Sequence, residues 1–125
     1  LNLADALCRI EPGVECLFLG GRRGIEARVL PDTGYDFRLL PLQPLYRQRP
    51  WRNWKLIASA PSICISVHRI FRDFSPALVV GTGGYVSGPA LVWARVSGCK
   101  LALQEQNAAP GLTTRLFAPC VDQII

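Results

Sequence analysis

The sequence predicts an α/β protein with a Rossmann-like parallel sheet and flanking helices. Short apolar runs that resemble strands alternate with segments of helical spacing, and no hairpin turn of the Asn-Gly kind joins them. This alternation favours βαβ units. The runs are apolar throughout, as is typical of parallel strands that are buried on both faces. At 125 residues, the chain has about the length of one domain.

The first half of the chain predicts two strands and two helices. A helix is expected over residues 1–10, because Leu3, Leu7 and Ile10 have helical spacing and Pro12-Gly13 provides a stop. The next expected elements are a strand over 14–19 that ends at Gly20-Gly21, a short helix over 24–30, a strand over 35–42 and an irregular basic loop over 44–53.

The second half opens with the strongest helix pattern of the chain, over residues 61–74. Pro61 suits the first turn of that helix, with residues 56–60 as a preceding turn. Its expected apolar face consists of Ile63, Val67, Ile70, Phe71 and Phe74. The remaining expected elements are strands over 77–80, 100–103 and 121–125, and helices over 88–96 and 111–117.

Composition excludes several classes of protein. Half of the residues are apolar and 18% are charged, which indicates a globular chain. No apolar run is long enough for a membrane span. Five cysteines without a C-x-x-C spacing and the single His68 disfavour a zinc site or a disulfide framework and favour a reducing compartment. We therefore expect no metal and no cofactor. The absence of methionine suggests a fragment of a longer product.

The positive charge is concentrated in one segment. Of the net charge of +5, four charges lie within residues 47–55, which also contain Trp51 and Trp54. Tryptophan among basic residues is typical of contact with an anionic membrane surface. A solvated loop is the plain alternative. Contact with single-stranded RNA is a further one, but no nucleic-acid motif accompanies the segment, so no nucleic-acid partner is expected.

Two motifs follow predicted strands, where ligands bind in parallel sheets. The first is G-T-G-G-Y-V-S-G-P at residues 81–89. Its glycines, between a strand and a helix, suit a turn whose N–H groups hold a phosphate or diphosphate, and Ser87 offers a hydroxyl. A tight turn without a ligand is the alternative. The motif is neither a Walker loop nor a G-x-G-x-x-G fingerprint.

The second motif is Q-E-Q-N-A-A-P-G-L-T at residues 104–113. Its carboxamides and its carboxylate are suitable partners for sugar hydroxyls. Local capping of the loop by Asn107, Thr113 and Thr114 explains the same residues without a ligand. Glu105 is the acid in this loop and so a possible catalytic residue.

Together, these two motifs resemble the MurG family of peptidoglycan N-acetylglucosaminyltransferases. Leu19-Gly20-Gly21 and G-I-E-A-R-V-L-P at residues 24–31 fit the same family, and the resemblance is loosest over 44–66. It implies a GT-B glycosyltransferase of which residues 1–125 form a partial N-terminal, acceptor-side domain. The first strand of the fold and the C-terminal, donor-binding domain would be absent.

The resemblance also implies a reaction. The family moves GlcNAc from UDP-GlcNAc to the MurNAc 4-hydroxyl of lipid I, which gives lipid II, with inversion and without a strict need for metal. It acts as a peripheral protein at the cytoplasmic face of the inner membrane; a plastid is possible if the source is a plant or alga.

Site residues are carried over by position. The implied substrate-binding residues are Gly83, Gly84, Tyr85, Ser87, Gln104, Glu105 and Asn107. The implied membrane patch consists of Arg49, Trp51, Arg52, Trp54, Lys55, Ile57 and Ile63. Gln104 stands where the family usually has His, and Gln cannot act as a base. The favoured base of the family is a His upstream of this chain, so the catalytic residue is unknown and Glu105 is a candidate.

A missing first strand would leave its two neighbours without a common partner. We therefore expect the 125-residue chain alone to be marginally stable or prone to aggregation, and inactive as a transferase. Other interpretations are a related glycolipid glycosyltransferase such as a plastid glycolipid synthase, a non-catalytic remnant that binds membrane or lipid, and a simple nucleotide-binding module.

Overall fold

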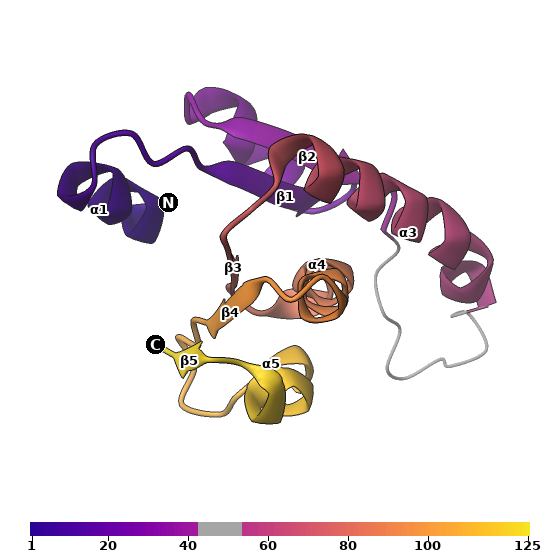
Figure 1. Cartoon of the computed structure of the whole chain (residues 1–125). Helices are drawn as coiled ribbons and strands as arrows, with labels where there is room; N and C mark the ends of the chain where they lie inside the picture. The colour runs from indigo at the N-terminus through magenta and orange to yellow at the C-terminus, as the bar shows by residue number, and fades with distance from the viewer. Residues whose placement is uncertain (43–53) are drawn as a thin grey trace.

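The computed structural model describes residues 1–42 and 54–125, and it has the predicted α/β architecture (Figure 1). The first group of elements is α1 (Asn2–Ile10), β1 (Leu17–Gly21), α2 (Glu26–Val29), the short 3-10 helix η1 (Leu30–Asp32) and β2 (Asp36–Leu40). The second group is α3 (Trp54–Phe74), β3 (Leu78–Gly81), α4 (Gly84–Val96), β4 (Lys100–Leu103), α5 (Leu112–Phe117), the 3-10 helix η3 (Ala118–Cys120) and β5 (Gln123–Ile124).

All strand pairs are parallel, as the apolar runs predicted, but the strands form two sheets. β1 pairs with β2 from Leu17 opposite Asp36 to Gly21 opposite Leu40. The other sheet has the order β3-β4-β5. Within the described residues β1 and β3 are not paired with each other, and the two strand groups lie apart in Figure 1. The expectation that these two strands lack a common partner is confirmed.

Helix α3 is longer than its pattern predicted. It begins at Trp54, so residues 56–60 are helical and Pro61 lies inside the helix, not in its first turn. A proline removes a single backbone hydrogen bond and crowds the preceding turn. Such a defect within a helix of 21 residues is tolerated, because the apolar face beyond it is packed. The loop predicted over 44–53 lies outside the described residues.

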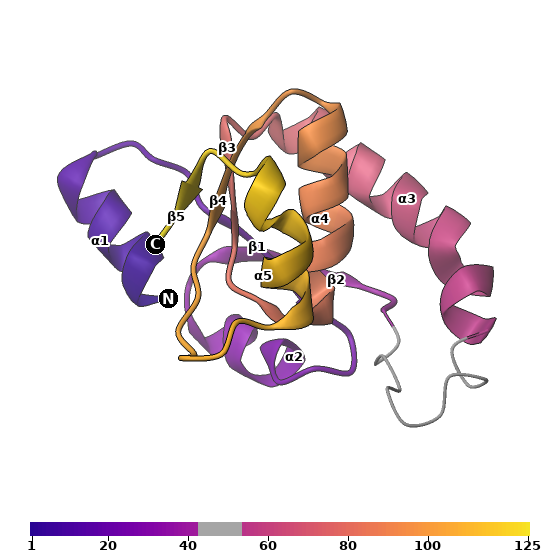
Figure 2. The ribbon, with the colours of Figure 1, turned by 90° about the horizontal axis from the view of Figure 1, so that it is seen from below.

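Helix α4 also begins earlier than predicted, at Gly84 and not at Gly88. Glycines lowered the expected helix propensity over this segment. Gly84, Tyr85 and Ser87 therefore lie in the first turn of α4, and Pro89 lies inside it. Figure 2 shows α4 between α3 and α5, so the glycine turn enters the central helix of this layer.

The core lies between helices α3 and α4 and the strands. Leu40, Val67, Leu91, Leu101 and Leu103 are its fully buried members. The predicted apolar face of α3 is confirmed at Ile63, Val67 and Phe71, which are buried. Across residues 1–42 and 54–125, no helix is both long enough and apolar enough to cross a membrane.

Candidate functional site

The glycine motif forms a turn that is packed on one side and open on the other. Gly83 and Gly84 have φ angles of 87° and 74°, in the left-handed region that favours glycine. A Cβ added to either would meet no atom within 4 Å, whereas one added to Gly81 would lie 2.9 Å from the Leu103 side chain. The turn thus fits closely against the core and leaves its outer side accessible.

The N-terminus of α4 lacks a side-chain cap. Gly83 is its N-cap residue, and no side chain hydrogen-bonds to the first N–H groups. Uncapped N–H groups at a helix N-terminus, together with the helix dipole, form a site where an anion is stabilised. The Ser87 hydroxyl donates to the Gly83 carbonyl oxygen at 2.6 Å. Its proton therefore secures the turn, and in this arrangement it is not offered to a ligand.

Tyr85 connects the glycine turn to the β1–α2 turn. Its side chain is half-buried, and its hydroxyl lies 3.6 Å from where a Cβ on Gly21 would stand. Burial raises the pKa of Tyr85, and the nearby Glu26 carboxylate raises it further. The phenol is consequently neutral at physiological pH and can donate one hydrogen bond.

Glu105 organises the second motif. Its Oε1 accepts hydrogen bonds from the Asn107 backbone N–H at 3.1 Å and from Asn107 Nδ2 at 2.9 Å. Its Oε2 accepts from the Gly111 N–H at 3.0 Å and from the Thr114 hydroxyl at 2.6 Å. These bonds, the Thr114 bond above all, lower the pKa of Glu105 to about 2. A carboxylate that acidic is a weak base, so the geometry favours a role in loop order and argues against proton transfer.

One side-chain hydrogen bond joins the two motifs. The Thr113 hydroxyl donates to the Gly84 carbonyl oxygen at 2.8 Å. At the strand ends, the Gln104 N–H donates to the Gly81 carbonyl oxygen at 2.8 Å. Asn107 is exposed on the same loop. The sequence predicted that both motifs would lie at the carboxyl ends of neighbouring strands, and the structure brings them together there.

The turn between β1 and α2 lies beside the two motifs, and only its glycines stood out in the sequence. Glu26 lies over Gly20 and Gly24, where an added Cβ would come within 2.6 Å and 1.8 Å of Glu26 side-chain atoms. Its Oε2 is buried and has no hydrogen-bond partner among the described residues. Sequence reasoning assigned Glu26 no role. The available signal was its place in G-I-E-A-R-V-L-P, directly after a strand that ends in glycines.

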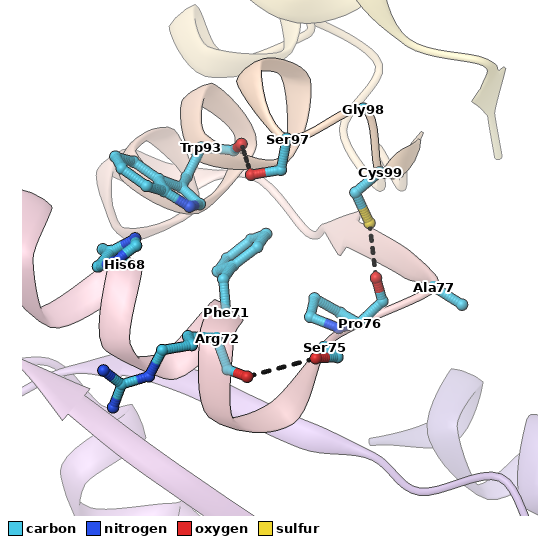
Figure 3. Close-up of a pocket in the computed structure, with 10 residues that line it drawn as sticks. All are labelled: His68, Phe71, Arg72, Ser75, Pro76, Ala77, Trp93, Ser97, Gly98 and Cys99. Atoms are coloured by element: carbon cyan, nitrogen blue, oxygen red, sulfur yellow. Dashed lines mark hydrogen bonds between the residues drawn. The ribbon is translucent and has the colours of Figure 1, made fainter.

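A cavity of about 590 Å³ lies elsewhere, between the C-terminal ends of α3 and α4 (Figure 3). Its wall includes Phe71 and the rings of His68 and Trp93, whose centroids are 5.2 Å apart. Pro76 and Cys99 also line it, and both precede strands. The cavity is thus at the edge opposite the two motifs and contains none of the predicted substrate-binding residues. His68 is exposed.

Most of the predicted membrane patch lies outside the described residues. Arg49, Trp51 and Arg52 lie outside the described residues, as do the side chains of Trp54, Lys55 and Ile57 at the start of α3. Ile63 is a correction. It is only 6% exposed and packs in the core with Val67 and Phe71, because its position on α3 faces the sheet side of the helix. It is not available for contact with a membrane.

Comparisons with known proteins identify the same family that the two motifs resemble. All residues, 1–125, match the family model of the glycosyltransferase family 28 N-terminal domain. The chain is 43% identical over 126 residues to the UDP-N-acetylglucosamine--N-acetylmuramyl-(pentapeptide) pyrophosphoryl-undecaprenol N-acetylglucosamine transferase of Chlorobaculum parvum, covering 98% of this chain and 35% of that protein. It is 38% identical over 122 residues to the protein of the same name from Syntrophus aciditrophicus, covering 98% and 34%.

A solved structure from the same family has a similar fold. The crystal structure of Acinetobacter baumannii MurG matches with a TM-score of 0.75 and 25% identity, covering 98% of this chain and 34% of that one. The chain therefore spans about a third of the length of the relatives that it matches.

Proposed function

Because this chain belongs to the family of glycosyltransferase family 28 N-terminal domains, we propose that it forms the acceptor-side part of a lipid I N-acetylglucosaminyltransferase. The donor is UDP-GlcNAc, and the acceptor is MurNAc-pentapeptide linked through a diphosphate to a polyprenol. The names of the relatives describe this transfer. The observation that carries the proposal is the hydrogen bond from Thr113 to Gly84. It holds the two loops side by side, so that a ligand can contact both.

The acceptor diphosphate is assigned to the glycine turn. Support comes from the uncapped start of α4 and from the open space outside Gly83 and Gly84. Backbone N–H groups in such a turn bind phosphate oxygens without a side chain. Tyr85, whose neutral phenol lies at the neighbouring turn, supplies a donor to the acceptor at the same edge.

The donor sugar is assigned to the loop after β4. Asn107 is exposed there, and its position is fixed by two hydrogen bonds to Glu105. Gln104 is half-buried beside it and retains amide donors and an acceptor. Glu105 is a positioning residue in this proposal, because both of its oxygens are already engaged within the loop.

The transfer itself is a displacement. The acceptor hydroxyl oxygen forms a bond to the anomeric carbon of GlcNAc, the bond from that carbon to UDP breaks with inversion, and a base takes the hydroxyl proton. UDP leaves with the bonding electron pair. This chain contributes orientation and charge stabilisation near the acceptor, and we assign the base to no residue within it.

A peripheral position on an anionic membrane surface belongs to the same proposal. The polyprenol of the acceptor is held in a bilayer, and residues 47–55 carry four cationic and two tryptophan side chains. Basic residues near anionic lipid contribute on the order of 1 kcal/mol each. We place this contact at the cytoplasmic face, where the nucleotide sugar is available.

A chimera tests the proposed function. In the Chlorobaculum parvum relative, the matched segment of 126 residues is replaced by this chain, and the remaining two-thirds supply the donor-binding part. We expect the purified chimera to transfer labelled GlcNAc from UDP-GlcNAc to a lipid I analogue, with the parent enzyme as the control. A chimera that unfolds cooperatively like the parent but transfers no sugar contradicts the proposal.

A further inference from the structure

Two of the five cysteines face each other across the junction of α1 and β1. Cys8 lies near the end of α1, and Cys16 directly precedes β1. Their sulfur atoms are 3.9 Å apart. Both side chains are partly exposed, so a small reagent can approach them. The proximity is built by the fold and does not belong to either of the substrate loops.

The surrounding contacts hold the pair in place while leaving room for a small movement. A disulfide needs the sulfurs about 2.05 Å apart, so they must approach by about 2 Å. The Tyr35 hydroxyl donates to Asp5 Oδ1 at 2.5 Å, which anchors α1 beside β2. Residues 11–15 between the cysteines are exposed, and a Cβ added to Gly13 would meet no atom within 4 Å, so no packed neighbour blocks a shift of their turn.

We propose that Cys8 and Cys16 form a reversible oxidation site, which is converted to an intramolecular disulfide by exchange with a small-molecule disulfide such as oxidised glutathione. One cysteine thiolate attacks the glutathione disulfide, forms a mixed disulfide and releases one reduced glutathione. The second cysteine thiolate then attacks the protein sulfur and releases the other. The cysteine pair loses two electrons and two protons, and oxidised glutathione gains them as two thiols.

The other cysteines provide internal controls. Cys64 and Cys120 are exposed, so they are expected to give mixed disulfides with glutathione but no intramolecular link. The Cys99 thiol donates to the Pro76 carbonyl oxygen at 3.1 Å. Burial raises the pKa of this thiol, and the charge of Asp122 raises it further, so Cys99 is expected to react slowly.

The local environment sets the pH dependence of the exchange. Burial raises the pKa of Cys16, and the neighbouring Cys8 and Asp5 raise it further. Tyr35, which stays protonated, faces the same pair. The thiolate is the reactive form, so the link should form slowly at neutral pH and faster as the pH approaches 9. Once formed, it ties α1 covalently to the start of β1.

Peptide mapping tests the site directly. The 125-residue chain is equilibrated in oxidised and reduced glutathione, once in native buffer and once in concentrated urea, and free thiols are then blocked with N-ethylmaleimide. Trypsin cleaves after Arg9 and Arg22, so Cys8 and Cys16 fall in peptides 1–9 and 10–22. A Cys8–Cys16 disulfide appears as these two peptides joined. Circular dichroism verifies that the native sample is helical.

We expect the joined peptides to be favoured by roughly tenfold in native buffer over urea, because the fold holds the thiols together. Cys64→Ser should leave them unchanged, and Cys16→Ser should convert Cys8 to a mixed disulfide. The joined form should also melt at a higher temperature than the reduced chain. Equal amounts of the joined peptides in native buffer and in urea, with helicity intact, overturn the proposal. So does pairing of Cys8 with Cys64 as often as with Cys16.

Discussion

The Thr113 hydroxyl donates a hydrogen bond to the Gly84 carbonyl oxygen at 2.8 Å, across 29 residues of sequence. Gly84 begins α4, and Thr113 lies in the first turn of α5. The bond therefore couples the start of the helix assigned to the acceptor diphosphate with the loop assigned to the donor sugar. It is the contact that most directly supports one shared surface.

Removing this bond should weaken the proposed site. Thr113→Val in the chimera keeps the size of the side chain but removes the donor, and a typical hydrogen bond contributes about 1 kcal/mol. We expect KM for the lipid I analogue to rise by roughly fivefold. Thr113→Ser retains the hydroxyl and is the matched control. Equal KM values for the Val and Ser variants would show that the bond has no part in acceptor binding.

Two glycines in the same helix should respond to alanine in opposite directions. Gly84→Ala forces a side chain into a φ of 74°, which costs about 1–2 kcal/mol. Gly88→Ala adds a Cβ to open space inside α4 at an ordinary φ, and should stabilise by about 0.5–1 kcal/mol. Urea unfolding of both variants measures the difference. Equal effects of the same sign would contradict the described turn.

Glu105 should make the folding stability of the chain depend on pH in the acidic range. Its pKa is lowered from 4.5 to about 2 in the folded chain. Stability from its ionised form is therefore fully present above pH 4.5 and is lost as the pH falls towards 2. We expect thermal melting of wild type and Glu105→Gln to differ at pH 6 and to converge near pH 2. A difference that stays constant over this range would refute the described hydrogen bonds.

Kinetics separate this ordering role from proton transfer. In the chimera, Glu105→Gln should lower the rate while leaving the pH midpoints of kcat/KM unchanged, because a carboxylate of pKa about 2 does not titrate in the working range. If Glu105→Gln abolished the acidic limb of the profile, Glu105 would be the base after all.

The membrane contact predicts a loss of vesicle binding. In the chimera, Trp51→Ala with Trp54→Ala should greatly reduce pelleting with vesicles that contain anionic lipid, relative to pelleting without vesicles, since both indoles would sit at the bilayer interface. Trp93, which lines the cavity beside His68, provides the control variant Trp93→Phe. Pelleting that is unchanged by the double substitution would exclude the patch.

For the described residues, the sequence predicted the order and type of the five strands and five α-helices, because parallel strands and amphipathic helices leave strong local patterns. It misplaced the starts of α3 and α4. The local pattern places boundaries at Pro61 and Gly88. In the structure α4 continues through Gly88 because Val86 and Leu91 on either side are buried, and α3 includes Pro61 with its buried face beyond that residue. The lack of a common partner for β1 and β3 was expected from the resemblance, whereas the local pattern predicted one parallel sheet and not the two that are present.

The sequence predicted where the two loops lie relative to each other, but it did not predict the contacts that their side chains make. The adjacency of the two loops was foreseen from the carboxyl-end rule for parallel strands. The engagement of both Glu105 oxygens, the Ser87 bond back to Gly83 and the burial of Ile63 depend on contacts that no spacing reveals. Glu26 was overlooked because its effect, a raised pKa of Tyr85, depends on the two side chains being close in the fold.

Hydrogen exchange of the chimera with and without a lipid I analogue tests the central claim most directly. We expect slowed exchange over residues 81–88 and 104–114, the two loops joined by Thr113 and Gly84. Thr113→Val should reduce that protection in both segments together. Protection confined instead to the cavity beside His68 and Trp93, or none in either loop while the analogue is bound, would contradict the account.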